Sequence, residues 1–320
     1  MTTARSSQIC LEATPWYHCT TRCVRRAFLC GLDALTNRNF DHRKQWIEDR
    51  LLKVSSVFCI HIGAYAVMDN HYHVALKVDT QWAKSLPDLD VISRWNQLYK
   101  VGDAAKKKLN GETLSDDEQI LLTQQIAKWR KELCSISRFM AEINQYIARR
   151  ANKEDDVKGR FWEARFHSQA ILDDDALLRT LIYIDLNPFR AGMVQEACAA
   201  DQTSIKKRLD GEGSTLVPFR DTSHTQKLPF QNDTSLPATQ EEYIALLEWT
   251  ALSLKDTSVG KPESPLCFTK LGYSENQWLR SQKAKTHWHQ KALGSVSSVK
   301  KFCSLLDRKW IWRSPEHAIH

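Results

Sequence analysis

Two strand-like segments joined by a two-residue polar turn constrain the fold of this chain more than any other feature. Residues 57–68 read VFCIHIGAYAVM and residues 71–78 read HYHVALKV, and both are rich in the aromatic and β-branched residues that strands favour. The polar pair Asp69 and Asn70 separates them, and a short polar break between two such segments is typical of a tight turn. The sequence therefore predicts a β-hairpin over residues 57–78.

Further segments with strand or helix character lie on both sides of this hairpin. We expect strands at residues 16–25 and 165–171, and helices at residues 41–54, 136–147 and 173–188. The order strand, helix, strand, strand, helix, strand, helix is that of a split βαβ unit. The sequence therefore predicts an α+β fold with a ferredoxin-like antiparallel sheet and helices on one face.

The predicted hairpin and the helix at 136–147 are separated by an insertion. Residues 80–133 have helical character, and Ser115 with Glu118 forms a capping box ahead of the segment DEQILLTQQIAKW. We therefore expect a helical insertion at this point of the α+β domain.

Composition divides the chain into four parts. Its 320 residues are enough for one large domain or two ordinary ones. We expect a disordered N-terminus at 1–14, a main domain at 15–210, a linker rich in Gly, Pro, Ser and Thr at 211–238, and a basic helical C-terminal domain at 239–320. In the last part, Thr239 with Glu242 and Ser274 with Gln277 begin helices, and a final helix covers about residues 295–312.

The positive charge of the chain is concentrated near its C-terminus. The formal charge is +7, and the segment from Lys270 to Arg313 holds ten Lys or Arg residues against two acidic residues. Four of the eleven tryptophans lie in the same segment, namely Trp278, Trp288, Trp310 and Trp312. A basic segment with aromatic residues is typical of a polyanion-binding surface. The alternative is a solvated helical face whose tryptophans belong to a core.

Two function classes are disfavoured by composition. The chain has no run of 18 apolar residues, and its start lacks the basic and then apolar order of a signal peptide, so we expect neither a membrane span nor secretion. Its nine cysteines are odd in number and form no C-x-x-C pair. We therefore expect reduced thiols in a cytoplasmic protein, and a zinc site at Cys19 and Cys23 is disfavoured.

The triplet His71-Tyr72-His73 is the sharpest local feature. Residues two apart on a strand share a face, so the strand would have a buried and an open side. We expect the buried side to hold Tyr72, Val74, Leu76 and Val78, and the open side to hold His71, His73, Ala75 and Lys77. Two imidazoles on one sheet face suit a divalent ion with vacant positions, and the alternative is two histidines on a solvent-exposed strand.

A second triplet, His287-Trp288-His289, serves as a comparison. It lies in a helical window, where side chains at i and i+2 point about 200° apart. These two imidazoles cannot converge on one ion, so we expect a structural role or a phosphate contact.

A tyrosine and an asparagine share one face of the predicted helix at 173–188. Leu177, Leu181 and Ile184 form its apolar stripe, while Tyr183 and Asn187 are four residues apart. A phenol has a reference pKa of about 10 and attacks a phosphate well only when a metal polarises that phosphate. Tyr183 is therefore a candidate nucleophile and Asn187 a candidate third ligand. Tyr146, with Arg149 and Arg150 nearby, is the rival nucleophile.

The motifs AYAVMDNHYHVALKV (residues 64–78) and GRFWEARFHSQAILDDDALLRTLIYIDLNPFRAGMV (residues 159–194) resemble the REP-associated tyrosine transposases. These are single-tyrosine members of the HUH endonuclease superfamily, related to the IS200-like transposases. His71 and His73 match the family's histidine motif, Tyr183 precedes the N-P dipeptide as the family's nucleophile does, and Asn187 occupies the place of a further metal ligand. The resemblance covers about residues 15–207.

This resemblance implies a transposase that acts on single-stranded DNA carrying hairpins, in the bacterial cytoplasm and in association with the nucleoid. Tyr183 would attack a phosphodiester held by Mg²⁺ or Mn²⁺ on His71, His73 and Asn187, which forms a 5′-phosphotyrosine and releases a 3′-hydroxyl. We expect DNA contacts from Arg160, Trp162, Arg165 and Lys77. The long insertion at 80–133 departs from the smallest members of the class. The basic segment beyond residue 239 has no part in the core chemistry, and we hypothesise that it clamps duplex or hairpin DNA.

Several other functions compete with this one. A domesticated protein that binds REP hairpins without cutting them would keep the fold, although all three chemical positions are present here. An RNA-binding module is less favoured, because such sheets present aromatic residues where this strand has histidines. Relaxases and replication initiators share the histidine motif, but we expect the tyrosine of relaxases early in the chain. The sequence leaves open whether the protein is a monomer or a homodimer.

Overall fold

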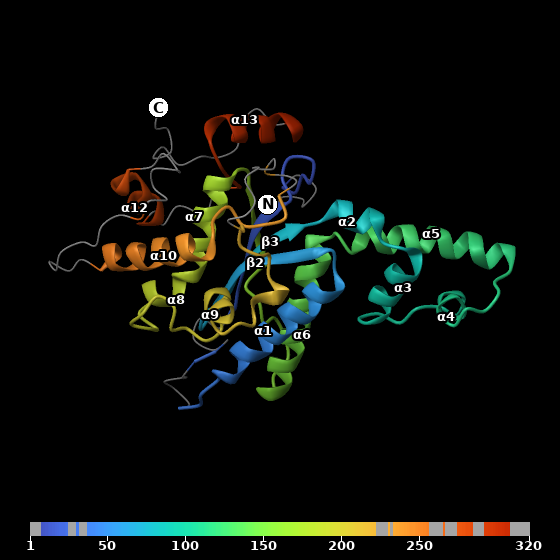
Figure 1. The fold of residues 1–320 in the computed structure, drawn as a ribbon. Helices are drawn as coiled ribbons and strands as arrows, with labels where there is room; N and C mark the ends of the chain where they lie inside the picture. Colours follow the sequence, from blue (N-terminus) through green and yellow to red (C-terminus); the bar gives the residue numbers. More distant parts are fainter. Residues whose placement is uncertain are drawn as a thin grey trace. The chain divides into compact units, whose positions relative to one another are not determined.

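The computed structural model describes residues 8–24, 30–31, 37–221, 230, 233–255, 265, 274–283 and 291–307. It is a mixed α+β structure with a five-stranded sheet in the order β2-β3-β1-β4-β5 (Figure 1). The strands are β1 (Trp16–Arg22), β2 (Ile60–Val67), β3 (His71–Val78), β4 (His167–Ile171) and β5 (Ala292–Leu293). β1 pairs antiparallel with β4, and β4 pairs parallel with β5.

The helices occur before, between and after these strands. They are α1 (His42–Val57), α2 (Thr80–Ser85), α3 (Asp88–Asn96), α4 (Asp103–Leu109), α5 (Asp116–Glu132), α6 (Ile136–Glu154), α7 (Asp174–Asp185), α8 (Asn187–Arg190), α9 (Ser204–Leu209), α10 (Gln240–Leu254), α12 (Glu275–Lys283) and α13 (Val296–Leu305). The predicted hairpin, the helices beside it and the helical character of residues 80–133 are confirmed. The mixed α+β class is confirmed as well, whereas the ferredoxin-like assignment and the placement of helices on one face stay predictions.

Contacts divide the chain into two compact units. Unit 1 contains residues 1–44, 62–76 and 161–320, and unit 2 contains residues 45–61 and 77–160. The histidine motif, β4 and all helices from α7 onward therefore belong to unit 1. Unit 2 holds most of α1 and the helices α2 to α6.

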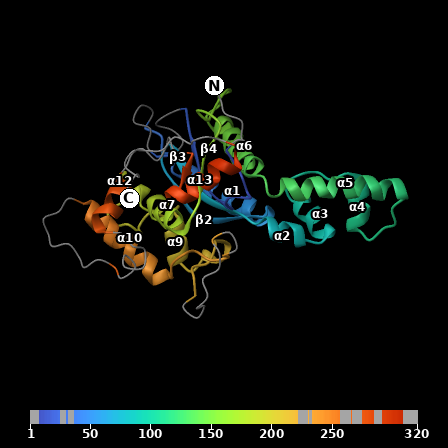
Figure 2. The same cartoon turned by 90° about the horizontal axis from the view of Figure 1, so that it is seen from above.

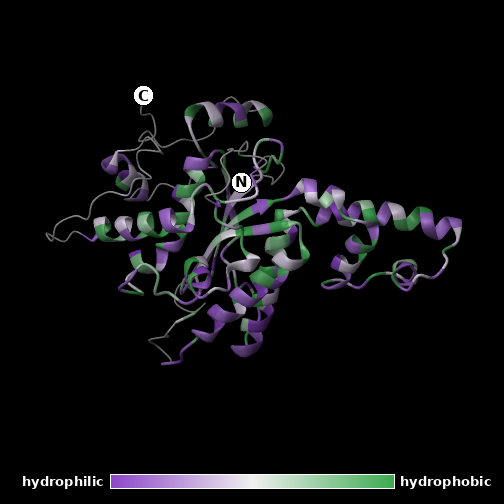
Figure 3. Ribbon diagram, viewed as in Figure 1, coloured by the Kyte–Doolittle hydropathy of each residue, from purple (hydrophilic) through white to green (hydrophobic). Residues whose placement is uncertain are grey.

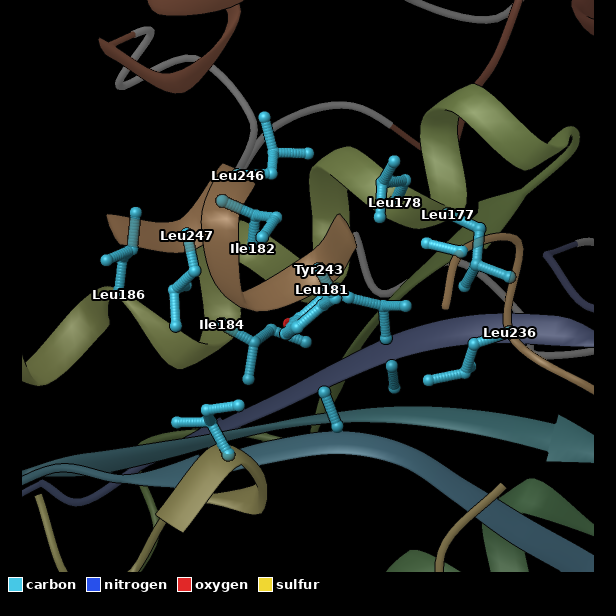
Figure 4. Close-up of a cluster of buried hydrophobic side chains, with 14 of the residues drawn as sticks. Leu177, Leu178, Leu181, Ile182, Ile184, Leu186, Leu236, Tyr243, Leu246 and Leu247 are labelled. Carbon is cyan, nitrogen blue, oxygen red and sulfur yellow. The ribbon is translucent and has the colours of Figure 1, made fainter. Parts of the chain in front are cut away.

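The core of unit 1 lies between one face of the sheet and helices α7 and α10. The predicted stripe of Leu177, Leu181 and Ile184 is buried in it, together with Trp16 on β1 and Ala75 on β3. Figure 4 shows the leucine and isoleucine side chains of α7 and α10 gathered above the strands. Helix α7 therefore covers the sheet face to which Ala75, and with it His71 and His73, belongs.

A glycine lets this face pack closely. A Cβ atom built on Gly63 of β2 would lie 2.6 Å from the Trp16 ring and 3.3 Å from a methyl carbon of Leu181. No side chain fits in that space, because such a contact is far shorter than van der Waals distance. Gly63 thus lets the indole of Trp16 lie between β2 and α7.

The prediction of an open face on β3 is wrong. His73, Ala75 and Lys77 are all buried, as are Tyr72 and Val74 on the opposite face, and only His71 is partly exposed. Alternation alone cannot reveal a second covered face, because the residues on it are small or polar. Helices of unit 1 pack over His73 and Ala75 and exclude solvent from this face.

A buried carboxylate anchors α7 in unit 1. Asp185 accepts hydrogen bonds from Ser204 Oγ (2.6 Å), from the Ile205 backbone nitrogen (3.2 Å) and from the Tyr243 hydroxyl (2.6 Å). Burial raises the pKa of the Asp185 carboxyl. These three bonds tie the C-terminal end of α7 to α9 and α10, so they fix the helix that carries Tyr183.

Unit 2 is helical apart from the strand ends that it includes. α1 and α6 are joined by an ion pair between Arg50 and Glu142 at 2.8 Å, and Phe58, the residue after α1, packs against Phe139 of α6. The helices α3, α4 and α5 lie side by side in both ribbon views (Figures 1 and 2), and hydrophobic residues alternate with hydrophilic ones along α5 (Figure 3). The predicted capping box at Ser115 is present at the start of α5.

Residues near the predicted boundaries at 14 and at 211–238 are packed in unit 1. Gln8 and Thr14 are buried, so the described part of the N-terminus is packed. Within the predicted linker at 211–238, Val217 donates its backbone N–H to the Ile62 carbonyl on β2, and Leu236 is buried in the core. The C-terminal helices therefore complete the core of unit 1.

The predicted helix starts at Thr239 and Ser274 are confirmed. Trp278 is buried and donates its indole N–H to Thr250 Oγ1 at 3.0 Å, so this tryptophan is part of the core. Trp288, Trp310 and Trp312 lie outside the described residues, as does the triplet at 287–289. Among the described helices, no helix has the length and apolar character needed to cross a membrane.

Candidate functional site

Three imidazoles gather on the sheet face that α7 covers. His71 and His73 come from β3 with their ring centroids 4.9 Å apart, and His18 comes from the adjacent strand β1. The planes of the His18 and His73 rings are 19° apart with their centroids at 5.1 Å, and the rings meet at their edges, where Nε2 of His18 lies 2.9 Å from Nδ1 of His73. The predicted pair is therefore part of a larger cluster.

The cluster continues to β4 through a glutamine. Nδ1 of His18 lies 2.9 Å from Oε1 of Gln169. The strand register sets this contact, because His18 on β1 is paired directly with Gln169 on β4. Thr20, two residues after His18 on the same face, places its hydroxyl 3.4 Å from His18 Nε2 and 3.3 Å from His73 Nδ1.

Tyr183 lies against this cluster. Its ring centroid is 5.6 Å from that of His73 and 6.3 Å from that of His18, with both pairs edge-to-face. The half-buried side chain leaves α7 on the side facing the sheet, beside the core stripe. The structure thus brings the predicted tyrosine and the predicted histidine motif together.

Two residues of the short helix α8, which follows α7, lie near Tyr183. Asn187 donates its side-chain amide to the Tyr183 backbone carbonyl at 2.7 Å, which leaves the amide oxygen as its candidate ligand atom. The guanidinium carbon of Arg190 lies 5.0 Å from the centroid of the Tyr183 ring. Arg190 was not predicted, although its spacing of seven residues from Tyr183 indicates a shared helical face.

Burial keeps the two motif histidines neutral. Burial, assisted by the positive charge of Arg22, lowers the pKa of His71 to about 4. Burial, assisted by His71 and His18, also holds the pKa of His73 well below its usual value. Near pH 7 both imidazoles are therefore neutral, which is the form that binds metal ions.

The imidazoles of His71 and His73 supply part of the ligands that a divalent metal ion needs. Two neutral imidazoles with adjacent rings are suitable ligands for such an ion. Within the described ranges, no group of three or more His, Cys, Asp or Glu side chains is arranged to hold a metal ion. Further ligands would therefore have to be of another kind, such as the amide oxygen of Asn187 or phosphate oxygens of a bound nucleic acid.

The four predicted DNA-contact residues have different environments. Arg160 and Arg165 are exposed, and Trp162 is half-buried against Tyr72 with ring centroids 6.0 Å apart. Lys77 is buried, which disfavours direct contact with a phosphate and corrects its predicted placement on an open face. Arg160 belongs to unit 2, and Trp162 and Arg165 belong to unit 1.

The rival tyrosine, Tyr146, belongs to unit 2. Its side chain is 38% exposed, and its hydroxyl accepts a hydrogen bond from Arg150 at 3.0 Å. The guanidinium carbon of Arg50 lies 4.8 Å from its ring centroid. Tyr146 is therefore part of an arginine–aromatic surface on α1 and α6.

His18 and Gln169 were not predicted as site residues. Each lies in a predicted strand, but a strand pattern does not reveal which strands are neighbours. The signal would have been the alternation of polar residues on those strands, His18 with Thr20 and His167 with Gln169, once the order β3-β1-β4 was known. The Asp185 anchor, inside the motif YIDLNP, was also missed.

Known proteins show a similarity to this chain at the level of a solved structure. No family model matches this chain, and no curated protein matches it. Among solved structures, it is similar to that of a REP-associated tyrosine transposase bound to a REP hairpin, with 14% sequence identity and a TM-score of 0.38. The similarity covers 73% of this chain and 98% of that chain.

Proposed function

We propose that this protein is a metal-dependent transposase that cuts and rejoins single-stranded DNA carrying hairpins, with Tyr183 as the nucleophile. One observation carries this function. The Tyr183 ring lies 5.6 Å from the ring of His73, which is itself beside His71 on β3. A tyrosine beside two histidines of one strand is what the sequence motifs of the REP-associated tyrosine transposases lead us to expect. We propose that the sheet carrying them is of the HUH type, with ferredoxin-like topology.

His71 and His73 would hold Mg²⁺ or Mn²⁺, with the amide oxygen of Asn187 as a further ligand. A bound divalent ion would neutralise charge on the scissile phosphate and orient it. The neutral state of both imidazoles supports this assignment, since only unprotonated nitrogens bind metals.

Tyr183 would carry out the covalent step. Its phenol oxygen attacks the phosphorus and loses its proton, and the 3′-oxygen leaves and takes up a proton. The products are a 5′-phosphotyrosine and a free 3′-hydroxyl. The new ester conserves the energy of the broken bond, so a second DNA 3′-hydroxyl can displace the tyrosine and rejoin strands. Arg190, whose guanidinium carbon lies 5.0 Å from the centroid of the phenol ring, would stabilise negative charge on the oxygen.

The exposed arginines are the candidates for DNA contact. Arg160 and Arg165 would bind phosphates, and the partly exposed Trp162 would stack on a base. The segment from Lys270 to Arg313 carries a net charge of +8 and would add sequence-independent affinity. Truncation after residue 215 is a poor test of that role, because Trp278 and Tyr243 are buried in the core of unit 1.

A cleavage assay tests the proposed function. Labelled single strands that carry a hairpin are incubated with the protein, with Mn²⁺ or with EDTA, and then separated on a denaturing gel. We expect a labelled covalent protein–DNA adduct and a free 3′-hydroxyl fragment in the reaction with Mn²⁺. Neither product should form in the reaction with EDTA. The adduct should be missing in Tyr183→Phe.

The same assay separates enzyme from binding protein. Binding to hairpin DNA without any adduct, under all metal conditions, would favour the alternative of a domesticated hairpin-binding protein. Neither binding nor cleavage of such strands would exclude both functions.

A further inference from the structure

A continuous line of hydrogen bonds connects β4 to the histidine motif on β3. Oε1 of Gln169 faces Nδ1 of His18 at 2.9 Å, and Nε2 of His18 faces Nδ1 of His73 at 2.9 Å. Gln169, His18 and His73 are exposed by 1%, 6% and 0%. Because water is excluded from all three side chains, their mutual contacts decide where their protons lie.

With the amide oxygen of Gln169 facing His18 and both imidazoles neutral, one arrangement of protons follows. An amide oxygen only accepts hydrogen bonds, so His18 must carry its proton on Nδ1 and donate it to Gln169. A neutral His18 then has a lone pair on Nε2, which accepts the hydrogen bond from Nδ1 of His73. His73 therefore carries its proton on Nδ1, and its Nε2 has a lone pair.

The nearby hydroxyl does not oppose this arrangement. Thr20 Oγ1 lies 3.4 Å from His18 Nε2 and 3.3 Å from His73 Nδ1. A hydroxyl can donate to the first atom or accept from the second. Both contacts are compatible with the proton positions that Gln169 imposes.

We propose that Gln169 and His18 are positioning residues that fix the tautomer of His73 with its proton on Nδ1 and so direct Nε2 to a divalent metal ion. The metal part of this inference rests on the proposed function, whereas the tautomer is a property of the protein alone. A metal-binding histidine commonly donates its other ring N–H to a partner that fixes its tautomer and orientation. Here the partner is a second histidine, itself oriented by a glutamine of the next strand.

The opposite orientation of the Gln169 amide would reverse the direction of both hydrogen bonds in this line. If the Gln169 nitrogen faced His18, His18 would accept at Nδ1 and donate from Nε2, and His73 would then carry its proton on Nε2. That tautomer cannot bind a metal through Nε2. A side chain on β4 that need not touch DNA or the ion would thus decide whether the histidine motif can act as a ligand.

Two substitutions and a control test the inference. Gln169→Met keeps the length of the side chain and removes the accepting oxygen, while Gln169→Glu keeps an acceptor at that place. Gln282→Met is the matched control, because Gln282 is another glutamine of unit 1 exposed by 1%, and it donates to the Arg179 carbonyl instead. Folding of each variant is checked by circular dichroism.

The readouts are spectroscopic and thermodynamic. ¹⁵N–¹H NMR of the imidazoles at pH 8.5, without metal or DNA, reports which nitrogen of His73 is protonated. Free Mn²⁺ measured by electron paramagnetic resonance reports metal affinity. We expect the Nδ1–H tautomer in the wild type, in Gln169→Glu and in Gln282→Met. In Gln169→Met we expect its loss and a Mn²⁺ affinity about 10- to 100-fold weaker.

Two results would overturn the inference: an Nε2–H tautomer of His73 in the wild type, or an unchanged tautomer in Gln169→Met. Failure of the proposed function looks different. A wild type that has the Nδ1–H tautomer and forms no adduct with DNA would leave the positioning roles intact and remove only the cleavage.

Discussion

The two candidate tyrosines, Tyr183 in unit 1 and Tyr146 in unit 2, differ in their neighbours more than in their helices. Each lies on a long amphipathic helix, and each has a guanidinium close to its ring, from Arg190 at 5.0 Å and from Arg50 at 4.8 Å. Tyr183 also lies against the rings of His73 and His18. The hydroxyl of Tyr146 instead accepts a hydrogen bond from Arg150.

This difference shows what makes a tyrosine a candidate nucleophile. A nearby positive charge is common to both, so it cannot distinguish them. The imidazoles that we propose as metal ligands lie beside Tyr183 and not beside Tyr146. The following predictions test whether this environment separates the two units.

The largest effect is expected from removal of the phenol oxygens. Tyr183→Phe should lower the rate of DNA cleavage by at least about 10⁴-fold, because the attacking atom is missing. Tyr146→Phe should leave the rate within a few-fold. The measurement is the covalent adduct of labelled hairpin DNA in single-turnover experiments. An adduct that persists in Tyr183→Phe and is lost in Tyr146→Phe would exchange the roles of the two residues.

The second largest effect is expected from removal of the His71 imidazole. His71→Ala should lower the cleavage rate at limiting Mn²⁺ by about 100-fold or more, because a ligand is lost. A higher Mn²⁺ concentration should recover part of that rate. The matched variant in unit 2 is His61→Ala, since His61 is a strand histidine that stacks on Trp82 with ring centroids 5.3 Å apart. Equal losses in both variants would show that His71 has only a general structural role.

The two units also differ in the burial of a hydrogen bond from a tyrosine hydroxyl to a carboxylate. Tyr243 is fully buried and donates to Asp185 at 2.6 Å, while Tyr99 is partly exposed and donates to Glu142 at 2.7 Å. Tyr243→Phe should cost about 1–3 kcal/mol of unfolding free energy, because Asp185 loses a partner inside the core. Tyr99→Phe should cost about 0.5–1.5 kcal/mol. Urea unfolding measures both, and a larger cost at Tyr99 would contradict the role of Asp185 as an anchor.

The smallest effect is expected at the arginines. Arg190→Gln should slow cleavage by about tenfold, since a cation near the ring stabilises charge on the phenol oxygen by roughly 1–2 kcal/mol. Arg150→Gln removes the corresponding cation beside Tyr146 and should leave the rate unchanged. Both rates are measured at saturating DNA, so that weaker binding does not contribute. A slower rate in Arg150→Gln alone would favour Tyr146.

Much of the fold could be predicted from local patterns. The hairpin, the stripe of Leu177, Leu181 and Ile184, and the cap at Ser115 depend on periodicity and short-range hydrogen bonds, which a sequence displays directly. The exposure of β3 could not be predicted in this way. His73 and Ala75 look like an open face, but they are buried because α7 crosses that face.

The sequence by itself determined the chemical groups of the candidate site: two histidines two residues apart on a strand, and a tyrosine and an asparagine one turn apart on a helix. Spacing within one element is a local property, so these pairs follow from the sequence alone. Only the tertiary structure decided which groups meet. The strand order β3-β1-β4 brings His18 beside His73 and Gln169 beside His18, and packing of α7 on the sheet turns Tyr183 toward His73. Such contacts join residues that are 55 to 151 positions apart, and they depend on the free energy of burying a whole face and not on any local pattern.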